Sequence, residues 1–448
     1  MENALALGVD IGTTSIAAQI VSLESGEAVY TCGFDHGAAM DIAGYPDAYA
    51  ADAEKLVSAA LGLVRDAVSE YPGIGAVGFS GQMHGIICLG EGLRMLSPLY
   101  TWQNAFGERA DGGVRICDGF RELTGEDVPT GYGFVTLYAL GRLGLLPENT
   151  RHFATVADAA AARLCGLDRA VMHPTMAASL GLYDIEGARF SAAAADIAGD
   201  AVLPDICRDY EIIGGFSYGG REIPVAAACG DNQLGAFGAL ADDGMVLINI
   251  GTSSQVSIVG AEGCGESRPY FDGKRIMSGS GLCGGRAYAA LAGLAAETAA
   301  AFGSRPEKRG IYEYLNRLAE EPETEPLEIS TRFCGTRDDP SLRGAIGGIS
   351  LSNFDMRHLA KGVLRGIAEE LHSMFLGMER PSGELRMAGA GNALRRCPAL
   401  RRICAEMFGG ELLMPRHTEE AAYGAALYAA VSAGLITRED SRALIKYL

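Results

Sequence analysis

The chain has 448 residues, of which 48% are hydrophobic and 21% are charged. These fractions exclude a largely disordered or fibrous protein, and the length predicts two or three domains. The formal net charge of −19, without any run of Lys or Arg, disfavours nucleic acids and anionic membrane surfaces as partners.

Targeting and redox signals point to a protein of the cytoplasm. Residues 1–4 carry no basic region or cleavage site, so no signal peptide is expected. The longest uncharged apolar stretch, 421–437, is shorter than the ~20 residues of a membrane span and predicts a buried core helix. The 11 cysteines form no C-x-x-C pair and read as reduced thiols. The 7 histidines form no H-E-x-x-H motif, so no transition-metal centre is expected.

The first predicted element is a strand, a turn and a second strand around the sequence D-I-G-T-T-S, which runs from Asp10 to Ser15. Gly12 allows the backbone to approach a ligand closely. The hydroxyl and N–H groups of Thr13, Thr14 and Ser15 can bind phosphate oxygens. Asp10, an acid at a strand end, is placed to hold Mg²⁺ through water. The alternative is a plain hairpin whose threonines supply β propensity.

Helices and strands alternate along the rest of the chain, which is typical of α/β domains. Helices are predicted where apolar residues recur with helical spacing, and strands where short apolar runs are bounded by turn residues. The predicted helices are 54–68, 355–375 and 398–408, and the predicted strands include 74–79, 86–89 and 385–388.

Two polar segments of the first half suit a polyol ligand. Gln82 and His84 lie in S-G-Q-M-H-G, between two predicted strands, and can hydrogen-bond hydroxyl groups. Trp102, the only tryptophan, precedes the amides of Gln103 and Asn104, and an aromatic face beside amide groups suits a sugar. The alternatives are a histidine satisfied within the core and a structural tryptophan.

A further acid follows the apolar run 225–229, in the sequence G-D-N-Q. The carboxyl end of a buried strand is where α/β proteins place ligand chemistry. Asp231 is therefore a candidate general base. The alternative is an N-cap for the helix predicted at 234–240, because Asp is favoured at that position. One residue can serve both purposes.

The first hairpin recurs about half a chain later, as I-N-I-G-T-S-S at 248–254. Gly251, Thr252 and Ser253 repeat the turn, whereas Asn249 stands where the first copy has Asp10. Two domains of similar build are predicted, at 1–243 and 244–448, and two facing turns can clamp a polyphosphate from both sides. A single metal ion needs a carboxylate in only one of the two copies, which agrees with Asp10 in the first and Asn249 in the second. Coincidence between two hairpins is the weaker interpretation.

A glycine-rich turn follows the strand predicted at 385–388 and precedes a helix. Gly389 and Gly391, with Asn392, can let an adenine or ribose lie against bare backbone. G-x-G alone is a weak signal, and a plain turn between a strand and a helix is an equal alternative.

Taken in order, these motifs resemble the FGGY carbohydrate kinases of the actin/hexokinase-like superfamily. The motifs, from D-I-G-T-T-S through S-G-Q-M-H-G, T-W-Q-N, G-D-N-Q and N-I-G-T-S to G-A-G-N-A-L-R-R-C-P, cover nearly the whole chain. Within the family the chain most resembles the sedoheptulokinase branch. The resemblance implies two actin-like (ribonuclease H-like) α/β domains with ATP and Mg²⁺ in a cleft between them. It also implies transfer of the γ-phosphoryl group to the terminal hydroxyl of a ketose.

The resemblance also implies roles for individual residues. Asp231 matches the catalytic base, Met83 and His84 the pair that contacts the sugar, and Asp10 the acid near the metal. Thr13, Thr14 and Ser15 match the first phosphate loop, and Gly251 and Thr252 the second. Gly389, Gly391 and Asn392 match the adenosine turn.

One departure from the family pattern concerns the sugar. Where the family has tryptophan, an amide, an aspartate, a glycine and an arginine, this chain reads W-Q-N-A-F, so Asn104 replaces the acid and Phe106 the arginine. Arg109 is a candidate replacement. The implied substrate is sedoheptulose, with xylulose or another ketose as the alternative. The rivals from other classes are a non-catalytic sugar- or nucleotide-binding regulator and a polymerising actin-like ATPase. A monomer or a homodimer is expected.

Overall fold

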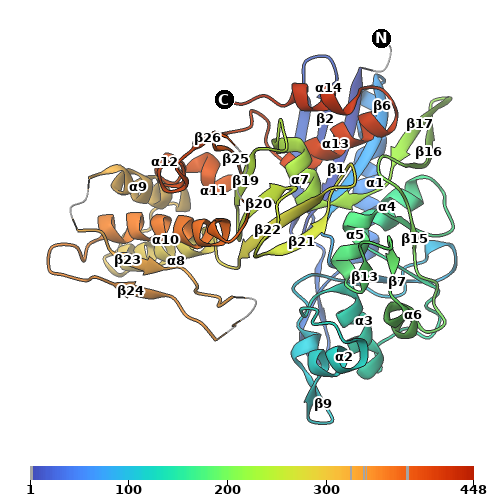
Figure 1. Cartoon of the computed structure of the whole chain (residues 1–448), viewed down its shortest axis with the longest axis horizontal. Helices are drawn as coiled ribbons and strands as arrows, with labels where there is room; N and C mark the ends of the chain where they lie inside the picture. Colours follow the sequence, from blue (N-terminus) through green and yellow to red (C-terminus); the bar gives the residue numbers. More distant parts are fainter. Residues whose placement is uncertain (1–3, 323–324, 337–338, 340, 380–382) are drawn as a thin grey trace. The chain divides into compact units, whose positions relative to one another are not determined.

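The computed structural model describes residues 4–322, 325–336, 339, 341–379 and 383–448. The chain divides into two compact units, each built around one mixed β-sheet (Figure 1). Unit 1 comprises 1–238, 268–274 and 417–446, and unit 2 comprises 239–267, 275–416 and 447–448. This division differs from the predicted single boundary after residue 243, because a C-terminal helix packs on the sheet of unit 1.

The sheet of unit 1 begins with the predicted hairpin. Strand β1 (Leu5–Ile11) pairs antiparallel with β2 (Ser15–Ser22), which pairs with β3 (Ala28–Asp35). On its other side β1 pairs in parallel with β6 (Ile74–Gly81), which lies beside β17 (Arg221–Ala226). Strand β16 (Ile212–Tyr218) forms the far edge, and β18 (Cys229–Gly230) pairs with the end of β6.

Helices cover both faces of this sheet. Helix α13 (Glu420–Ser432) lies against β1 and β6, where glycines permit the approach. A Cβ at Gly8 would lie 1.9 Å from the carbonyl oxygen of Ala422, and one at Gly78 would lie 2.2 Å from that of Ala425. The apolar stripe predicted at 54–68 forms α1 (Ala53–Glu70), which packs with α4 (Val156–Leu164) on the other face.

The remaining elements of unit 1 are short. They are β4 (Ala39–Ile42), β5 (Tyr45–Ala51), β7 (Ile87–Leu89), β8 (Leu99–Tyr100), β9 (Ala110–Asp111), β10 (Val114–Arg115), α2 (Ile116–Thr124), α3 (Gly133–Arg142), β11 (His152–Ala154), β12 (Val171–Met172), α5 (Pro174–Leu180), β13 (Tyr183–Asp184), β14 (Arg189–Phe190), α6 (Ala192–Ala198), β15 (Asp205–Ile206), α7 (Asp231–Ala239, whose last residue belongs to unit 2) and α14 (Arg438–Leu444), with single 3₁₀ turns at Glu91–Leu93 and Phe106–Glu108.

Unit 2 repeats the core of unit 1. Strand β19 (Val246–Ile250) pairs antiparallel with β20 (Ser254–Val259), which pairs with β22 (Arg275–Gly281). On its other side β19 pairs in parallel with β25 (Arg386–Ala390), followed by β26 (Glu411–Leu413). The order β22-β20-β19-β25-β26 reproduces β3-β2-β1-β6-β17, so the repeat seen in the sequence is a structural repeat.

Helix α10 (Met356–Leu376), predicted at 355–375, packs against β20, β22 and neighbouring helices. The neighbours are α8 (Gly285–Ala301), α9 (Lys308–Glu320) and α12 (Pro398–Phe408). Strand β21 (Glu266–Pro269) borders β22, and the rest of the unit is α11 (Asn392–Arg396) and the pair β23 (Glu328–Ser330) and β24 (Ala345–Gly347).

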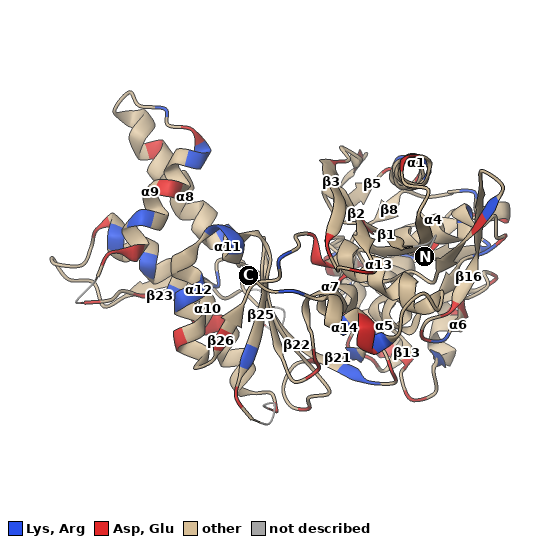
Figure 2. Cartoon of the chain, turned by 90° about the horizontal axis from the view of Figure 1, so that it is seen from above, with Lys and Arg blue, Asp and Glu red and all other residues tan. Residues whose placement is uncertain are grey.

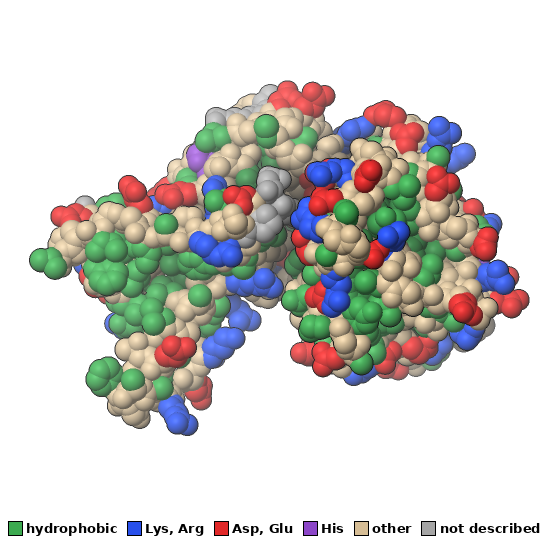
Figure 3. Space-filling model, turned by 90° about the horizontal axis from the view of Figure 1, so that it is seen from below, with side chains coloured by type: hydrophobic (Ala, Val, Ile, Leu, Met, Phe, Trp, Pro, Cys, Tyr) green, Lys and Arg blue, Asp and Glu red, His purple; other side chains and the backbone are tan. Residues whose placement is uncertain are grey.

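Several large apolar side chains of unit 2 are exposed, among them Leu351, Phe354 and Phe302, and Figure 3 shows apolar atoms gathered on one face of this unit. In the described part of the chain, no helix is long and apolar enough to cross a membrane. All 11 cysteines are free thiols, and most are at least partly buried.

Candidate active site

The predicted motifs of unit 1 meet at the carboxyl edge of its sheet. In the register of the central strands, Asp10 pairs with Ser80, which in turn pairs with Cys229 of β18. The turn after β1, the Q-M-H-G segment after β6 and the acid after β18 therefore leave three neighbouring strands at the same edge. This is the position at which open α/β sheets bind ligands.

Asp10 is the only charged residue on strands β1, β2 and β6. Figure 2 accordingly draws the ribbon beside the labels of β1 and β2 mostly in tan. The Asp10 Oδ1 atom is buried and, within the described residues, has no hydrogen-bond partner. Burial, together with the negative charge of Asp231, raises the pKa of the Asp10 carboxyl from 3.8 to about 7. Glu419, at the start of α13, contributes to the same rise. A cation near Asp10 would favour the ionised carboxylate and lower this pKa again.

Asp231 is the first residue of α7, as the alternative interpretation of a helix N-terminus expected. The Asn232 backbone N–H donates a hydrogen bond of 2.8 Å to Asp231 Oδ1. Burial raises the pKa of Asp231 from 3.8 to about 6, although the positive charge of Arg268 acts in the opposite direction. A carboxylate with this pKa is ionised at neutral pH and is a better proton acceptor than an exposed aspartate.

Arg268 is the residue of this site that sequence reasoning missed. It lies on β21 and its exposed fraction is only 4%. One guanidinium nitrogen lies 3.5 Å from His84 Nε2 and another lies 4.0 Å from Met83 Sδ. Arginine is almost never buried unless it has partners, so its position marks a polar site. In the sequence nothing separates it from the other arginines of the chain.

His84 is held on two sides. Its Nδ1 lies 2.6 Å from the carbonyl oxygen of Ser179, which can only accept, so Nδ1 carries the proton and donates. In the neutral ring Nε2 is then the atom that accepts from Arg268. The ring also lies 4.1 Å, centroid to centroid, from that of Tyr132. Both interpretations of His84 therefore hold, because it is satisfied within the core and lies at the predicted site.

Side chains from other segments of unit 1 form hydrogen bonds with the first glycine-threonine turn. Trp102 Nε1 donates a hydrogen bond of 2.9 Å to Thr13 Oγ1, and His36 Nε2 lies 3.1 Å from the Thr13 carbonyl oxygen. Thr14 and Ser15 remain exposed. The amide nitrogen of Gln82 lies 3.4 Å from the Gly12 carbonyl oxygen, and its buried Oε1 has no partner among the described residues. The structure thus joins Trp102 and Gln82 to the first glycine-threonine turn.

The loop after Trp102 differs from what the sequence suggested. Asn104 is only 1% exposed, and backbone groups use its amide: Nδ2 donates to the carbonyl oxygen of Ala48, and Oδ1 accepts from the N–H of Phe106. Asn104 therefore has a structural role, and its assignment as a sugar ligand stays a prediction. Gln103 is partly buried, and its role stays a prediction.

Phe106 and Arg109 also have structural partners. The ring of Phe106 is fully buried and packs against those of Tyr45 and Tyr100, at centroid distances of 5.5 and 5.8 Å. Arg109 forms an ion pair with Asp47 and lies over the ring of Tyr45. Phe106 is therefore packed against β5 and β8, and Arg109 is paired with Asp47 of β5, while the suggestion that Arg109 replaces the family's arginine stays a prediction.

In unit 2 the two predicted nucleotide motifs lie side by side. Asn249 of β19 pairs with Ala390 of β25, so the turns that follow these strands are neighbours. Gly391 has φ +87°, and a Cβ there would lie 2.5 Å from the carbonyl oxygen of Ile250. This close approach explains the glycine. At Gly251 a Cβ would meet no atom within 4 Å, so open space adjoins the turn.

The N-terminus of α8 adjoins the second turn. The Gly285 N–H donates a hydrogen bond of 2.8 Å to the carbonyl oxygen of Gly251. Thr252 and Ser253 are exposed beside it, as Thr14 and Ser15 are beside the first turn. Positive partial charge at a helix N-terminus favours an anion, so this turn suits phosphate as the first one does.

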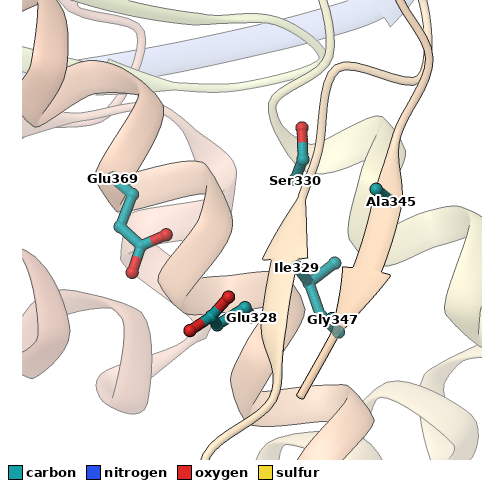
Figure 4. Close-up of a pocket in the computed structure, with 6 residues that line it drawn as sticks. All are labelled: Glu328, Ile329, Ser330, Ala345, Gly347 and Glu369. Carbon is teal, nitrogen blue, oxygen red and sulfur yellow. The ribbon is translucent and has the colours of Figure 1, made fainter. Parts of the chain in front are cut away.

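A hollow elsewhere in unit 2 contains none of the predicted residues (Figure 4). It is lined by Ile329, Ser330, Ala345 and Gly347 of the β23–β24 pair and by the carboxylates of Glu328 and Glu369. Two carboxylates repel a polyphosphate, so this hollow does not suit a nucleotide.

Comparison with known proteins decides the family. The model of the N-terminal domain of the FGGY family of carbohydrate kinases matches residues 5–238, which is more than half of the chain. The chain belongs to the FGGY family of carbohydrate kinases. It is therefore an ATP-dependent carbohydrate kinase rather than one of the rival classes considered above.

Individual relatives agree with this membership. This FGGY kinase is 28% identical to mouse sedoheptulokinase, with 94% of this chain and 96% of that protein aligned. It is 24% identical to gluconokinase of Bacillus subtilis, over 97% and 89% of the two chains. Ligand-bound xylulose kinase from Lactobacillus acidophilus superimposes with a TM-score of 0.82 at 17% identity, covering 99% of this chain and 92% of that one. The predicted fold of two actin-like domains is confirmed.

Proposed function

We propose that this FGGY kinase transfers the γ-phosphoryl group of ATP to the terminal hydroxyl of a ketose, with sedoheptulose as the preferred substrate. The observation that carries the proposal is the partly buried Asp231 carboxyl at the sheet edge, whose pKa is raised and which feels the charge of Arg268, with His84 in contact with the same arginine. A carboxylate, a guanidinium and an imidazole together offer both acceptors and donors to a polyhydroxylated molecule.

Asp231 acts as the base. It orients the terminal hydroxyl and accepts its proton as the phosphoryl group leaves ATP. Because phosphoryl transfer depends mainly on positioning and on charge stabilisation, a weak base suffices. The raised pKa of about 6 makes Asp231 a stronger acceptor while leaving it ionised at neutral pH.

Side chains from several elements contact the sugar. Gln82 and His84 follow β6, and Trp102 offers a ring that is 36% exposed. Met83 lines the site beside Arg268. Arg268 supplies the charged donor that the W-Q-N-A-F loop lacks, and it comes from a strand far away in the sequence.

The two glycine-threonine turns bind phosphate oxygens of ATP through Gly12, Thr13, Thr14 and Ser15 in unit 1 and through Gly251, Thr252 and Ser253 in unit 2. The neighbouring Gly389, Gly391 and Asn392 receive the adenosine. These assignments are supported by exposed hydroxyls at both turns and by open space at Gly251.

Asp10 fits a magnesium ion. Its buried Oδ1 lacks a partner among the described residues, and Mg²⁺ prefers carboxylate and phosphate oxygens. The described residues contain no group of three or more His, Cys, Asp or Glu that could hold a metal. One or two carboxylates combined with substrate phosphates and water is the usual arrangement for Mg²⁺. When bound, the ion neutralises phosphate charge, and Asp10 holds it near the transferred group.

The choice of sedoheptulose is supported by the 28% identity to mouse sedoheptulokinase along nearly both whole chains. Xylulose or another ketose remains the alternative. The deciding experiment measures kcat/KM by ADP release with sedoheptulose, xylulose, ribulose, fructose, gluconate and glycerol. We expect the highest value for sedoheptulose. A preference for glycerol, gluconate or an aldose contradicts the ketose assignment, whereas a preference for xylulose replaces only the named sugar.

A further inference from the structure

Behind Asp231 lies a chain of three buried or partly buried polar side chains that the reaction described above does not use. Asp209 Oδ1 lies 2.9 Å from His173 Nε2, and His173 Nδ1 lies 3.0 Å from Thr175 Oγ1. The backbone N–H of Gly230 donates a hydrogen bond of 3.1 Å to the same Thr175 oxygen. Gly230 immediately precedes Asp231. We propose that Asp209, His173 and Thr175 are positioning residues that fix the Gly230–Asp231 backbone and thereby aim the base.

The direction of each hydrogen bond in the chain follows from its partners. The Thr175 backbone N–H donates to His173 Nδ1 over 3.2 Å, so Nδ1 is the unprotonated nitrogen. The ring proton is then on Nε2 and is donated to Asp209. Thr175 Oγ1 accepts from Gly230, which leaves its own proton to be donated to Nδ1. Nδ1 then shares its one lone pair between the N–H and the O–H of Thr175, and all three side chains are joined in one chain of hydrogen bonds.

Burial makes this arrangement costly to break. His173 and Thr175 are both fully buried. Without the Thr175 hydroxyl, the Gly230 N–H would lose this partner in a place that water does not reach. An aspartate, a histidine and a hydroxyl in this order resemble a catalytic triad, but this hydroxyl is buried and accepts a backbone N–H, so it holds the backbone rather than attacking a substrate.

The same short helix also holds the other side of the site. Helix α5 begins with His173 as its N-cap, and the carbonyl oxygen of Ser179 near its end is the one that fixes His84. Asp209 has a second connection, because its Oδ2 accepts a hydrogen bond of 3.3 Å from the backbone N–H of Gly273, in the segment that carries Arg268. One network thus reaches the base, the histidine and the arginine.

A matched pair of variants tests the proposal. Thr175→Val removes the hydroxyl and nearly keeps the shape, whereas Thr175→Ser keeps the hydroxyl. Because a displacement of about 1 Å can cost 10²-fold in rate, we expect Thr175→Val to lower kcat by about 10- to 100-fold with little change in the KM for the sugar. We expect Thr175→Ser to retain most of kcat. The sugar used is the one with the highest kcat/KM in the panel above.

A second measurement does not depend on turnover. Hydrogen–deuterium exchange followed by mass spectrometry reports on the Gly230 amide directly. We expect faster exchange in the peptide containing Gly230 for Thr175→Val, and unchanged exchange for Thr175→Ser. Asp209→Asn should act in the same direction as Thr175→Val, because an uncharged amide at 209 accepts a weaker hydrogen bond from His173 Nε2 and holds the ring less firmly. Asp205→Asn, at an exposed carboxylate paired with Arg169, is the control and should change neither quantity.

The role of the network depends on Asp231 being the base proposed above, so Asp231→Asn is measured in parallel. If Asp231→Asn keeps full kcat, the assignment of the base fails, whatever the Thr175 variants do. If Asp231→Asn is inactive but Thr175→Val keeps both full kcat and slow Gly230 exchange, the base stands and the positioning network is refuted. Equal losses of kcat in Thr175→Val and Thr175→Ser would also refute it. Should Thr175→Val not fold, Asp209→Asn decides in its place.

Discussion

Asp10→Asn should make the protein more stable at alkaline pH while abolishing catalysis. The wild-type carboxyl is partly buried, with its Oδ1 atom inaccessible to water, and burial and the charge of Asp231 raise its pKa from 3.8 to about 7. One pH unit corresponds to about 1.4 kcal/mol, so ionising Asp10 in the folded protein costs about 4 kcal/mol. The asparagine has nearly the same shape and no charge, so it removes this cost.

The sign of the effect depends on pH. Below pH 3.8 the carboxyl is neutral in both the folded and the unfolded protein, so wild type and variant should be equally stable. Between pH 3.8 and about 7 only the unfolded chain ionises, and the wild type loses stability as the pH rises. The advantage of Asp10→Asn should therefore grow from less than about 1 kcal/mol near pH 4 to about 4 kcal/mol at pH 8.

Urea unfolding at pH 5 and pH 8 measures this difference. The fluorescence of Trp102, the only tryptophan, reports on unit 1, which contains Asp10. Mg²⁺ should stabilise the wild type at pH 8 but not the variant, because it binds the ionised carboxylate. An advantage that is the same at both pH values, or a variant that is less stable at pH 8, would refute the reasoning about burial.

The remaining predictions concern the base, the second phosphate turn and the loop core. Asp231→Asn should lower kcat by about 10²–10⁴-fold with sugar KM little changed. In the wild type kcat/KM should fall about tenfold for each pH unit below about 6, where Asp231 becomes protonated. Gly251→Val, at a site with open space, should weaken ATP binding in calorimetry and spare both sugar binding and the fold; loss of sugar affinity alone would contradict the phosphate role. Phe106→Ala should cost about 3–5 kcal/mol of stability in urea unfolding, as expected for a fully buried ring.

The features that sequence could predict are those carried by short contiguous patterns. The helix at 54–68 is predicted by the spacing of its own apolar residues, and the hairpins by a motif that occurs twice. The structure has both. The boundary between the units could not be found in this way. Residues 417–446 follow all of unit 2 in the sequence, yet α13 lies on the sheet of unit 1, where Gly8 and Gly78 make room for it. An apolar helix shows that it is buried, but not which sheet buries it.

In the candidate site, too, local sequence patterns predict where residues lie along the chain but not what their side chains contact. That Asp10, His84 and Asp231 lie at one edge of the sheet could be predicted, because each lies at the end of a predicted strand or shortly after one, and parallel strands end at one edge. The packing of the W-Q-N-A-F loop could not be predicted, because the pattern records which residue is present and not which way it faces. Asn104 and Phe106 pack against residues of β5 and β8, so their departure from the family pattern is first a difference in packing.

The arginine missing from that loop bears on how substrate preference arises in this chain. Arg268 occupies a buried position 3.5 Å from His84, although it lies more than 150 residues further along the sequence. A guanidinium that arrives from a different strand need not present its donors from the same direction as one in the loop. The hydroxyls it can reach are therefore set by the course of β21 and by the segment that Asp209 anchors through Gly273. If the sugar binds beside His84 as proposed, preference among sugars depends on this segment as much as on the tryptophan loop, so we expect substitutions near Gly273 to alter sugar selectivity without touching the sugar.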